Sequence, residues 1–105
     1  MAASQVISVP QSTLADYCRR LHIARLALFG SVLRDDFRPD SDVDVLVEFE
    51  RGHVPGLIGL GTMEIELSQF FGGRKVDLHT PGSLGPEIRE TVLREAEVQF
   101  GNVEG

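Results

Sequence analysis

The segment FGSVLRDDFRPDSDVDVLVEF, residues 29–49, decides the fold. It begins at the end of a short apolar run, 24–29 (ARLALF), which Gly30 interrupts. This pattern predicts a buried strand that ends in a turn. A short helical turn over 31–36 is expected next, and 42–49 (DVDVLVEF) then alternates apolar and polar residues. An alternation with period two predicts a second strand with one buried face.

Helices and a further strand are predicted on both sides of this segment. Ser12 is expected to cap a helix over 13–23, whose apolar residues recur at helical spacing. A second helix is expected over 57–71, a third strand over 75–79, and a last helix over 86–100. The expected order is αβαβαβα, an α/β fold with helices packed on a small sheet.

Length and charge exclude several classes of protein. The chain has 105 residues, so a single domain over 1–105 with an ordered core at about 12–100 is expected. The formal net charge of −6 has the wrong sign for a protein that coats nucleic acid, so no direct nucleic-acid binding is expected. The most apolar stretch, 54–63, is too short and too rich in glycine to span a membrane. The first residues do not resemble a secretory signal, so a cytoplasmic location is expected.

Cysteine and histidine offer little sign of a metal site. A single cysteine, Cys18, excludes an internal disulfide and any zinc site built on a cysteine pair, and it is expected in the core. His22, His53 and His79 lie on unrelated predicted elements. They are expected to be surface or packing residues rather than ligands.

Negative charge is concentrated around the second predicted strand, where seven of the sixteen acidic residues lie within 35–50. Side chains at i and i+2 of a strand share a face, so Asp42 and Asp44 are expected side by side with valines on the other face. Neighbouring carboxylates repel each other unless a cation, an arginine or solvent compensates them. Mg²⁺ typically binds one or two protein carboxylates, so a bound Mg²⁺ would compensate this repulsion. A strand face exposed to solvent is the simpler alternative.

Two further features indicate phosphate chemistry. Gly30-Ser31 opens a helical turn after a strand, where backbone N–H groups and a hydroxyl can hold a phosphate. This turn and the acids Asp42 and Asp44 are expected at the carboxyl side of neighbouring strands. Asp77, in a third strand, offers another carboxylate. Together these residues predict a two-metal site for phosphoryl transfer.

The order GS, ten residues, DxD and a later Asp resembles the minimal nucleotidyltransferases, or MNT proteins, of the DNA polymerase beta superfamily. The residues that carry this resemblance are Gly30, Ser31, Asp42, Asp44 and Asp77. Arg34 matches an arginine that is common three residues after the serine of the family. Asp35 stands where the family commonly has a small residue.

The resemblance implies a mixed sheet flanked by helices, two Mg²⁺ ions, and ATP as a substrate. It implies that Asp42, Asp44 and Asp77 are catalytic metal ligands and that Gly30, Ser31 and Arg34 bind the nucleotide. Family members of this size are commonly encoded beside a HEPN-domain protein and act as its antitoxin, and in characterised systems of that kind they transfer AMP to a tyrosine of the toxin. A hetero-oligomer with such a partner is therefore expected.

Two other functions remain open at this stage. The chain could be an antitoxin that neutralises its partner by binding alone, with a site that no longer acts. It could also transfer a nucleotide to a small molecule, as the relatives that modify aminoglycosides do. The first alternative needs no catalysis, and the second needs a pocket for the acceptor.

Overall fold

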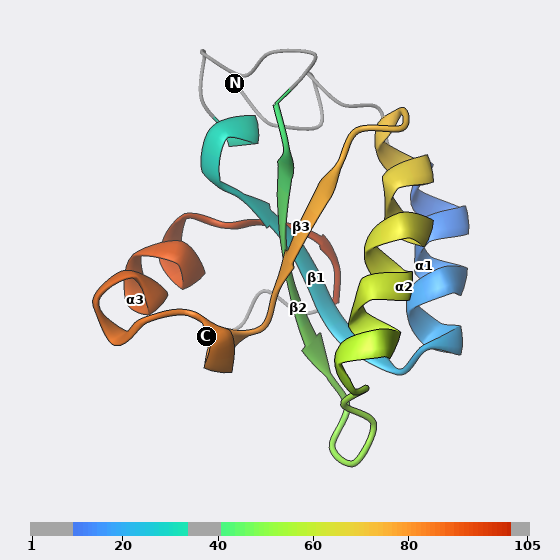
Figure 1. The fold of residues 1–105 in the computed structure, drawn as a ribbon, viewed down its shortest axis with the longest axis horizontal. Helices are drawn as coiled ribbons and strands as arrows, with labels where there is room; N and C mark the ends of the chain where they lie inside the picture. Colours follow the sequence, from blue (N-terminus) through green and yellow to red (C-terminus); the bar gives the residue numbers. More distant parts are fainter. Residues whose placement is uncertain (1–9, 34–40, 102–105) are drawn as a thin grey trace.

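The computed structural model describes residues 10–33 and 41–101. Its helices and strands are easily followed along the chain (Figure 1). They are α1 (Gln11–Arg20), β1 (Ile23–Phe29), β2 (Val43–Phe49), α2 (Leu57–Ser68), β3 (Val76–His79), α3 (Pro86–Glu95) and β4 (Glu97–Phe100).

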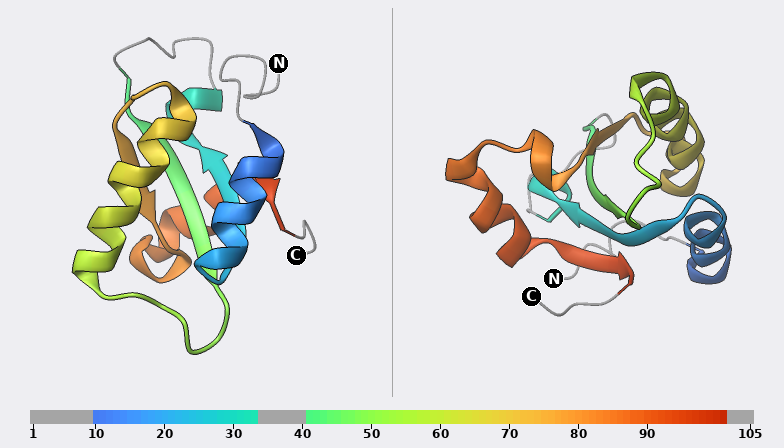
Figure 2. Two further views of the ribbon diagram at one scale, coloured as in Figure 1. Left: turned by 90° about the vertical axis from the view of Figure 1, so that its right-hand side faces the viewer. Right: turned by 90° about the horizontal axis from the view of Figure 1, so that it is seen from below.

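The four strands form one mixed sheet in the order β3-β2-β1-β4. β1 is antiparallel to both β2 and β4, whereas β2 and β3 are parallel. α1 and α2 cover one face of the sheet, and α3 lies on its other side (Figure 2). The expected α/β fold, a small mixed sheet flanked by helices, is therefore confirmed.

The core lies between the sheet and the two helices α1 and α2. β2 contributes Val43, Val45 and Val47 to it, and β3 contributes Val76. The remaining members are Leu14, Tyr17, Cys18, Ile23, Leu26, Leu28, Val32, Met63, Leu67 and Phe71. Because strand side chains alternate, the residues between these valines lie on the opposite face of the sheet.

The predictions for the ends of two helices are wrong. α1 begins at Gln11 with Pro10 at its N-cap, and no side chain caps it, so the expected cap by Ser12 is not formed. α3 ends at Glu95, because Ala96 is extended, and the next four residues form β4 instead of helix. Val98 of β4 pairs with Ala27 of β1, so this strand covers an edge of β1 that would otherwise lack partners.

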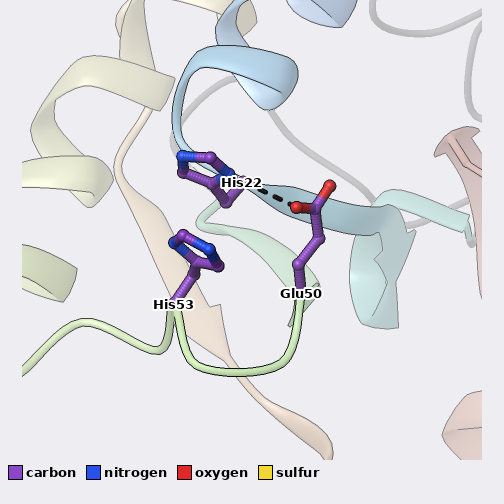
Figure 3. A group of neighbouring side chains, drawn as sticks. All are labelled: His22, Glu50 and His53. Atoms are coloured by element: carbon purple, nitrogen blue, oxygen red, sulfur yellow. Dashed lines mark hydrogen bonds and ion pairs between the residues drawn. The ribbon is translucent and has the colours of Figure 1, made fainter.

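The histidines are less scattered than the sequence indicates. His22, between α1 and β1, lies against His53, in the loop after β2, and the two rings stack with centroids 3.8 Å apart (Figure 3). Glu50 lies beside them, and its backbone N–H donates to the carbonyl of His22 over 2.9 Å. The loop after β2 is thus folded against the start of β1.

Within the described residues, no helix combines the length and the apolar character needed to cross a membrane. The predicted helical turn over 31–36 is present as a 3₁₀ turn over Gly30–Leu33. Its last residues, 34–36, lie outside the described part of the chain.

Cys18 is fully buried in the core, as expected. Burial raises the pKa of its thiol from the ordinary value of 9.0 to about 12. Burial also raises the pKa of the neighbouring Tyr17, and the hydrogen bond from its hydroxyl to Glu66, 2.8 Å long, adds to this effect. Both groups therefore stay protonated in the folded chain at a pH where the unfolded chain loses the protons.

We expect the free energy of unfolding to fall as the pH rises above about 9. Below that pH the Cys18 thiol is protonated in both states, and the full stability is present. Between about pH 9 and 12 the unfolded chain releases this proton first, which favours unfolding by up to about 1.4 kcal/mol per pH unit. Urea denaturation over this range measures the loss. Cys18→Ala should lose less stability than the natural chain over the same range, and an equal loss would contradict the assignment to Cys18.

Candidate active site

The candidate site lies where β1 ends and β2 begins. Because these strands are antiparallel, Gly30 at the carboxyl end of β1 lies beside Asp44 near the amino end of β2. The expectation that both features lie at the carboxyl side of neighbouring strands is therefore wrong. The turn and the acids still meet at one end of the sheet.

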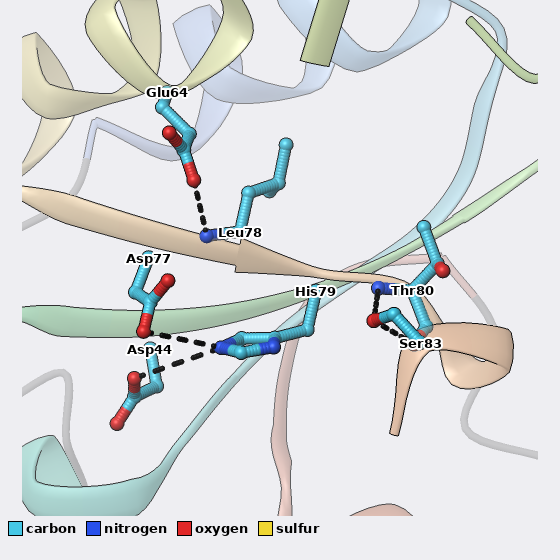
Figure 4. A network of polar contacts seen from close by, with 7 residues as sticks. All are labelled: Asp44, Glu64, Asp77, Leu78, His79, Thr80 and Ser83. Atoms are coloured by element: carbon cyan, nitrogen blue, oxygen red, sulfur yellow. Dashed lines mark hydrogen bonds and ion pairs between the residues drawn. The ribbon is translucent and has the colours of Figure 1, made fainter. Parts of the chain in front are cut away.

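Asp44 and Asp77 are brought together by the parallel pairing of β2 and β3, in which they are direct partners. His79, two residues after Asp77, lies on the same face. Its Nε2 is 3.3 Å from Asp77 Oδ2 and 4.0 Å from Asp44 Oδ1 (Figure 4). One ligand atom from each of the three residues lies within 4.8 Å of the other two. We call Asp44, Asp77 and His79 the acidic group.

The electrostatics of the acidic group depend on the imidazole of His79. Two carboxylates on neighbouring strands repel each other, and the Nε2 edge of the ring, which lies within 4.0 Å of both, can offset part of this repulsion. The ring of Phe29 meets that of His79 at 65°, with centroids 5.3 Å apart, and helps to hold it in place. The side chain of Asp77 is 52% exposed and that of Asp44 only 26%, so Asp77 is the more open to a substrate.

β3 is supported from α2 and from the turn that follows it. Glu64 of α2 accepts a hydrogen bond from the backbone N–H of Leu78, 2.9 Å long. After the strand, the hydroxyl of Ser83 accepts from the N–H of Thr80 at 3.0 Å (Figure 4). These contacts hold the strand on both sides of His79 and so limit the positions that Asp77 can take.

Gly30 leaves the space that Asp44 occupies. Its φ of +79° belongs to the left-handed region, which favours glycine. A Cβ at this position would collide with Oδ2 of Asp44. Ser31, next in the 3₁₀ turn, is half-buried. The GS pair therefore lies against the acidic group, as the phosphate-binding hypothesis requires.

Two other predicted site residues, Asp42 and Arg34, are not part of the acidic group. Asp42 is exposed and lies one residue before β2, outside the acidic group. The alternation of β2, continued by one step, gives it the face of Asp44. Arg34 lies outside the described residues.

A hollow of about 560 Å³ opens beside the GS pair, between the end of β1 and α3. Phe29, Gly30 and Leu33 line one side of it, and Ile88 and Val92 of α3 line the other. It adjoins the acidic group through Gly30, which contacts Asp44. A substrate that reaches Asp44 therefore also has room next to it.

The donors of the acidic group fit Mg²⁺. This hard cation prefers carboxylate oxygens and keeps several water or phosphate ligands. Asp44 and Asp77 each offer such oxygens at one point of the sheet, with Asp42 two residues before Asp44. The nitrogen of His79 suits Mg²⁺ less well and is better placed as a polar partner of Asp77, whose Oδ2 lies 3.3 Å away.

His79 is the member of the site that sequence reasoning missed. Its spacing of two residues from Asp77 in a predicted strand puts both on one face. That spacing alone could have identified it. The contact with Asp44 depends on the pairing of β2 with β3, which no local pattern contains.

Comparisons with known sequences agree with this geometry. A family model described as a nucleotidyltransferase domain matches residues 12–98. The protein adenylyltransferase MntA of Thermococcus cleftensis is 41% identical over 76 residues, which are 72% of this chain and 74% of that protein. A protein of Methanocaldococcus jannaschii, described provisionally as a protein adenylyltransferase, is 35% identical over 74 residues, 70% of this chain and 76% of that protein.

Solved structures share the fold. One described provisionally as a minimal nucleotidyltransferase superposes with a TM-score of 0.69 at 34% identity and covers 91% of this chain and 94% of that chain. A crystal structure of a toxin–antitoxin with AMP-PNP superposes with a TM-score of 0.70 at 18% identity. It covers 90% of this chain and 75% of that chain, and at this identity the likeness extends to the fold alone.

We expect Gly30→Ala to destabilise the chain more than Gly52→Ala. Both glycines have a positive φ, so an alanine is strained by about 1–2 kcal/mol at either position. Only at Gly30 does the new Cβ also meet the carboxylate of Asp44, whereas nothing lies near it at Gly52. This contact should add about 1–3 kcal/mol, measurable by urea denaturation.

A double variant tests the cause of the difference. Asp44→Ala combined with Gly30→Ala should recover most of the extra loss, because the group that collides with the new Cβ is gone. Equal losses for Gly30→Ala and Gly52→Ala would contradict the contact.

Proposed function

Because the chain belongs to the nucleotidyltransferase domain family, we propose that it transfers AMP from ATP, with Mg²⁺, to a tyrosine hydroxyl of a HEPN-domain toxin. It would thereby act as the antitoxin of that partner. The observation that carries the proposal is the meeting of Asp44 and Asp77 beside the turn at Gly30. The choice of a protein as acceptor is supported by relatives named protein adenylyltransferase.

The proposed reaction is a displacement at the α-phosphorus of ATP. The acceptor oxygen forms a bond to this phosphorus, and the bond from the phosphorus to the oxygen that bridges to the β-phosphate breaks. Pyrophosphate leaves, and AMP remains joined to the tyrosine by a phosphodiester bond. The proton of the hydroxyl passes to Asp77, the more exposed of the two paired acids.

Asp42, Asp44 and Asp77 would hold Mg²⁺, which when bound neutralises phosphate charge and makes the attacking hydroxyl more acidic. His79 would orient Asp77 through the 3.3 Å contact between Nε2 and Oδ2. It is a positioning residue in this scheme.

Gly30 and Ser31 would bind the phosphates of ATP. A turn that opens a 3₁₀ helix presents backbone N–H groups to an anion, and the missing Cβ of Gly30 lets this turn lie close to Asp44. Arg34 is proposed as a further phosphate ligand on the basis of the family resemblance.

The surface next to the site suits a macromolecular acceptor. Ile88 of α3, which lines the hollow beside Gly30, is 53% exposed, and Leu93 of the same helix is also exposed. Large exposed apolar side chains next to a site are typical of a surface that binds another protein. A partner that covers α3 would bring its hydroxyl close to the acidic group.

Intact mass spectrometry of a candidate toxin, incubated with the chain, ATP and Mg²⁺, tests the proposal. We expect a mass increase of one or more AMP units on the toxin. Asp44→Asn should reduce the rate of this increase by at least about 10²-fold, because one of the carboxylates proposed to hold Mg²⁺ is lost. Asp16→Asn, at an exposed acid of α1, is the matched control and should leave the rate unchanged.

The same experiment separates the two alternatives. A toxin that co-purifies with the chain but gains no mass would contradict the transfer and favour an antitoxin that acts by binding. Transfer of AMP to an aminoglycoside but not to the toxin would instead indicate an enzyme with a small-molecule acceptor.

A further inference from the structure

A second group of side chains that could ligate a metal ion lies at the end of the sheet opposite the acidic group. It consists of His22, Glu50 and His53, which we call the histidine group (Figure 3). All three residues are exposed, and one ligand atom from each lies within 4.8 Å of the other two. None of them takes part in the proposed transfer of AMP.

The backbone holds these residues together before any ligand binds. The N–H of Glu50 donates to the carbonyl of His22 over 2.9 Å, and the N–H of His53 donates to the carbonyl of Glu50 over 3.0 Å. His22 has a φ of +60° and is the one non-glycine residue with a positive φ in 10–33 and 41–101. A left-handed conformation is costly for a residue with a Cβ, although histidine adopts it more readily than most.

The side chains converge on one small volume. The two imidazole rings stack at an interplanar angle of 16°, and Nδ1 of His22 lies 3.3 Å from Oε1 of Glu50. Two nitrogen atoms and one carboxylate oxygen, from two segments that are 28 residues apart, therefore lie within 4.8 Å of one another. Backbone and side-chain contacts both keep them there.

We propose that the histidine group is a Zn²⁺ site with three protein ligands and water in the fourth position. Two imidazoles with one carboxylate form a well-known donor set for zinc, and imidazole suits this metal better than Mg²⁺ or Ca²⁺. Bond lengths near 2.1 Å in a tetrahedron require ligand atoms about 3.4 Å apart. Nδ1 of His22 and Oε1 of Glu50 already lie 3.3 Å apart, and rotation of the exposed side chain of His53 out of the ring stack would complete the set.

The zinc site is distinct from the acidic group. Glu50 follows β2 and lies six residues from Asp44, which corresponds to about 20 Å along an extended strand. Bound zinc would join the turn before β1 to the loop after β2, because His22 comes from the first and His53 from the second. This loop leads into α2, whose first residue, Leu57, is exposed.

A zinc titration of the full chain tests the proposal. The starting protein is Asp44→Asn/Asp77→Asn, which removes the carboxylates of the acidic group as competing ligands. After treatment with a chelator and its removal, Zn²⁺ is added in competition with a chromophoric chelator. We expect one equivalent of zinc to bind. Adding His53→Ala should weaken this binding at least about tenfold.

The matched control is His79→Ala in the same starting protein, which removes a histidine of the other group and should leave zinc affinity unchanged. Circular dichroism shows whether each variant is folded. The natural chain provides a check that needs no change in the acidic group, since His53→Ala alone should lose one equivalent of zinc.

The visible absorption of bound Co²⁺ and the melting temperature are two independent measures of metal binding. Co²⁺ in the site should give the visible absorption of a tetrahedral complex, which His53→Ala abolishes. Zinc at 100 times its dissociation constant should raise the melting temperature by about 10 °C or more, and this rise should disappear in His53→Ala. Equal zinc affinity with and without His53, or no binding by the folded starting protein, would overturn the proposal. No readout depends on AMP transfer.

Discussion

The parallel register of β2 and β3 is the constraint on which the rest of the structure depends. It pairs Val43 with Val76 and Asp44 with Asp77. Because side chains alternate along both strands, this register buries the valines under α2 and places both acids on the opposite face. A shift of one residue in this pairing would direct a carboxylate at the core, where an unpaired charge is very costly. The same pairing therefore determines both the core and the acidic group.

The charge repulsion within the acidic group has to be compensated, and residues of neighbouring elements contribute to this. Asp44 and Asp77 would repel each other across the strands, and the imidazole of His79 lies within 4.0 Å of both. Gly30 lies against Asp44 as well, and because glycine has no Cβ, the carboxylate of Asp44 fits against the turn. Both features of the site lower the stability of the fold, because a left-handed turn and two adjacent acids are each unfavourable by themselves. Such costs are typical of residues retained for chemistry.

The sequence predicts most of the fold because its strongest patterns are local. The alternation in 42–49 and the glycine after 24–29 place β1 and β2 to within a residue or so. β4 was missed because Val92, Ala96 and Phe100 fit a helical spacing, while Val98 and Phe100 fit a strand. The choice between the two depends on the free edge of β1, which is a tertiary property.

The distinction between local patterns and tertiary contacts also holds for the site. The motif identifies Gly30, Asp44 and Asp77 one by one, and family membership follows from residues 12–98. The contact of His79 with Asp44, and that of His22 with His53, arises only when segments distant in sequence are brought together. Their elements are unrelated along the chain, which is why a reading of the sequence treats these histidines as surface residues.

The two ends of the sheet differ in the donors they offer. The acidic group presents carboxylate oxygens that suit Mg²⁺ and phosphate chemistry, whereas the histidine group presents two imidazoles and one carboxylate. A strand length of about 20 Å separates Asp44 from Glu50, so a metal ion at one end leaves the ligands of the other end untouched. Screening at physiological salt weakens interactions beyond about 8 Å, and effects of substitutions at the two ends should therefore be additive. β2 is the most direct connection between the two ends, because Asp44 lies near its start and Glu50 directly follows its last residue.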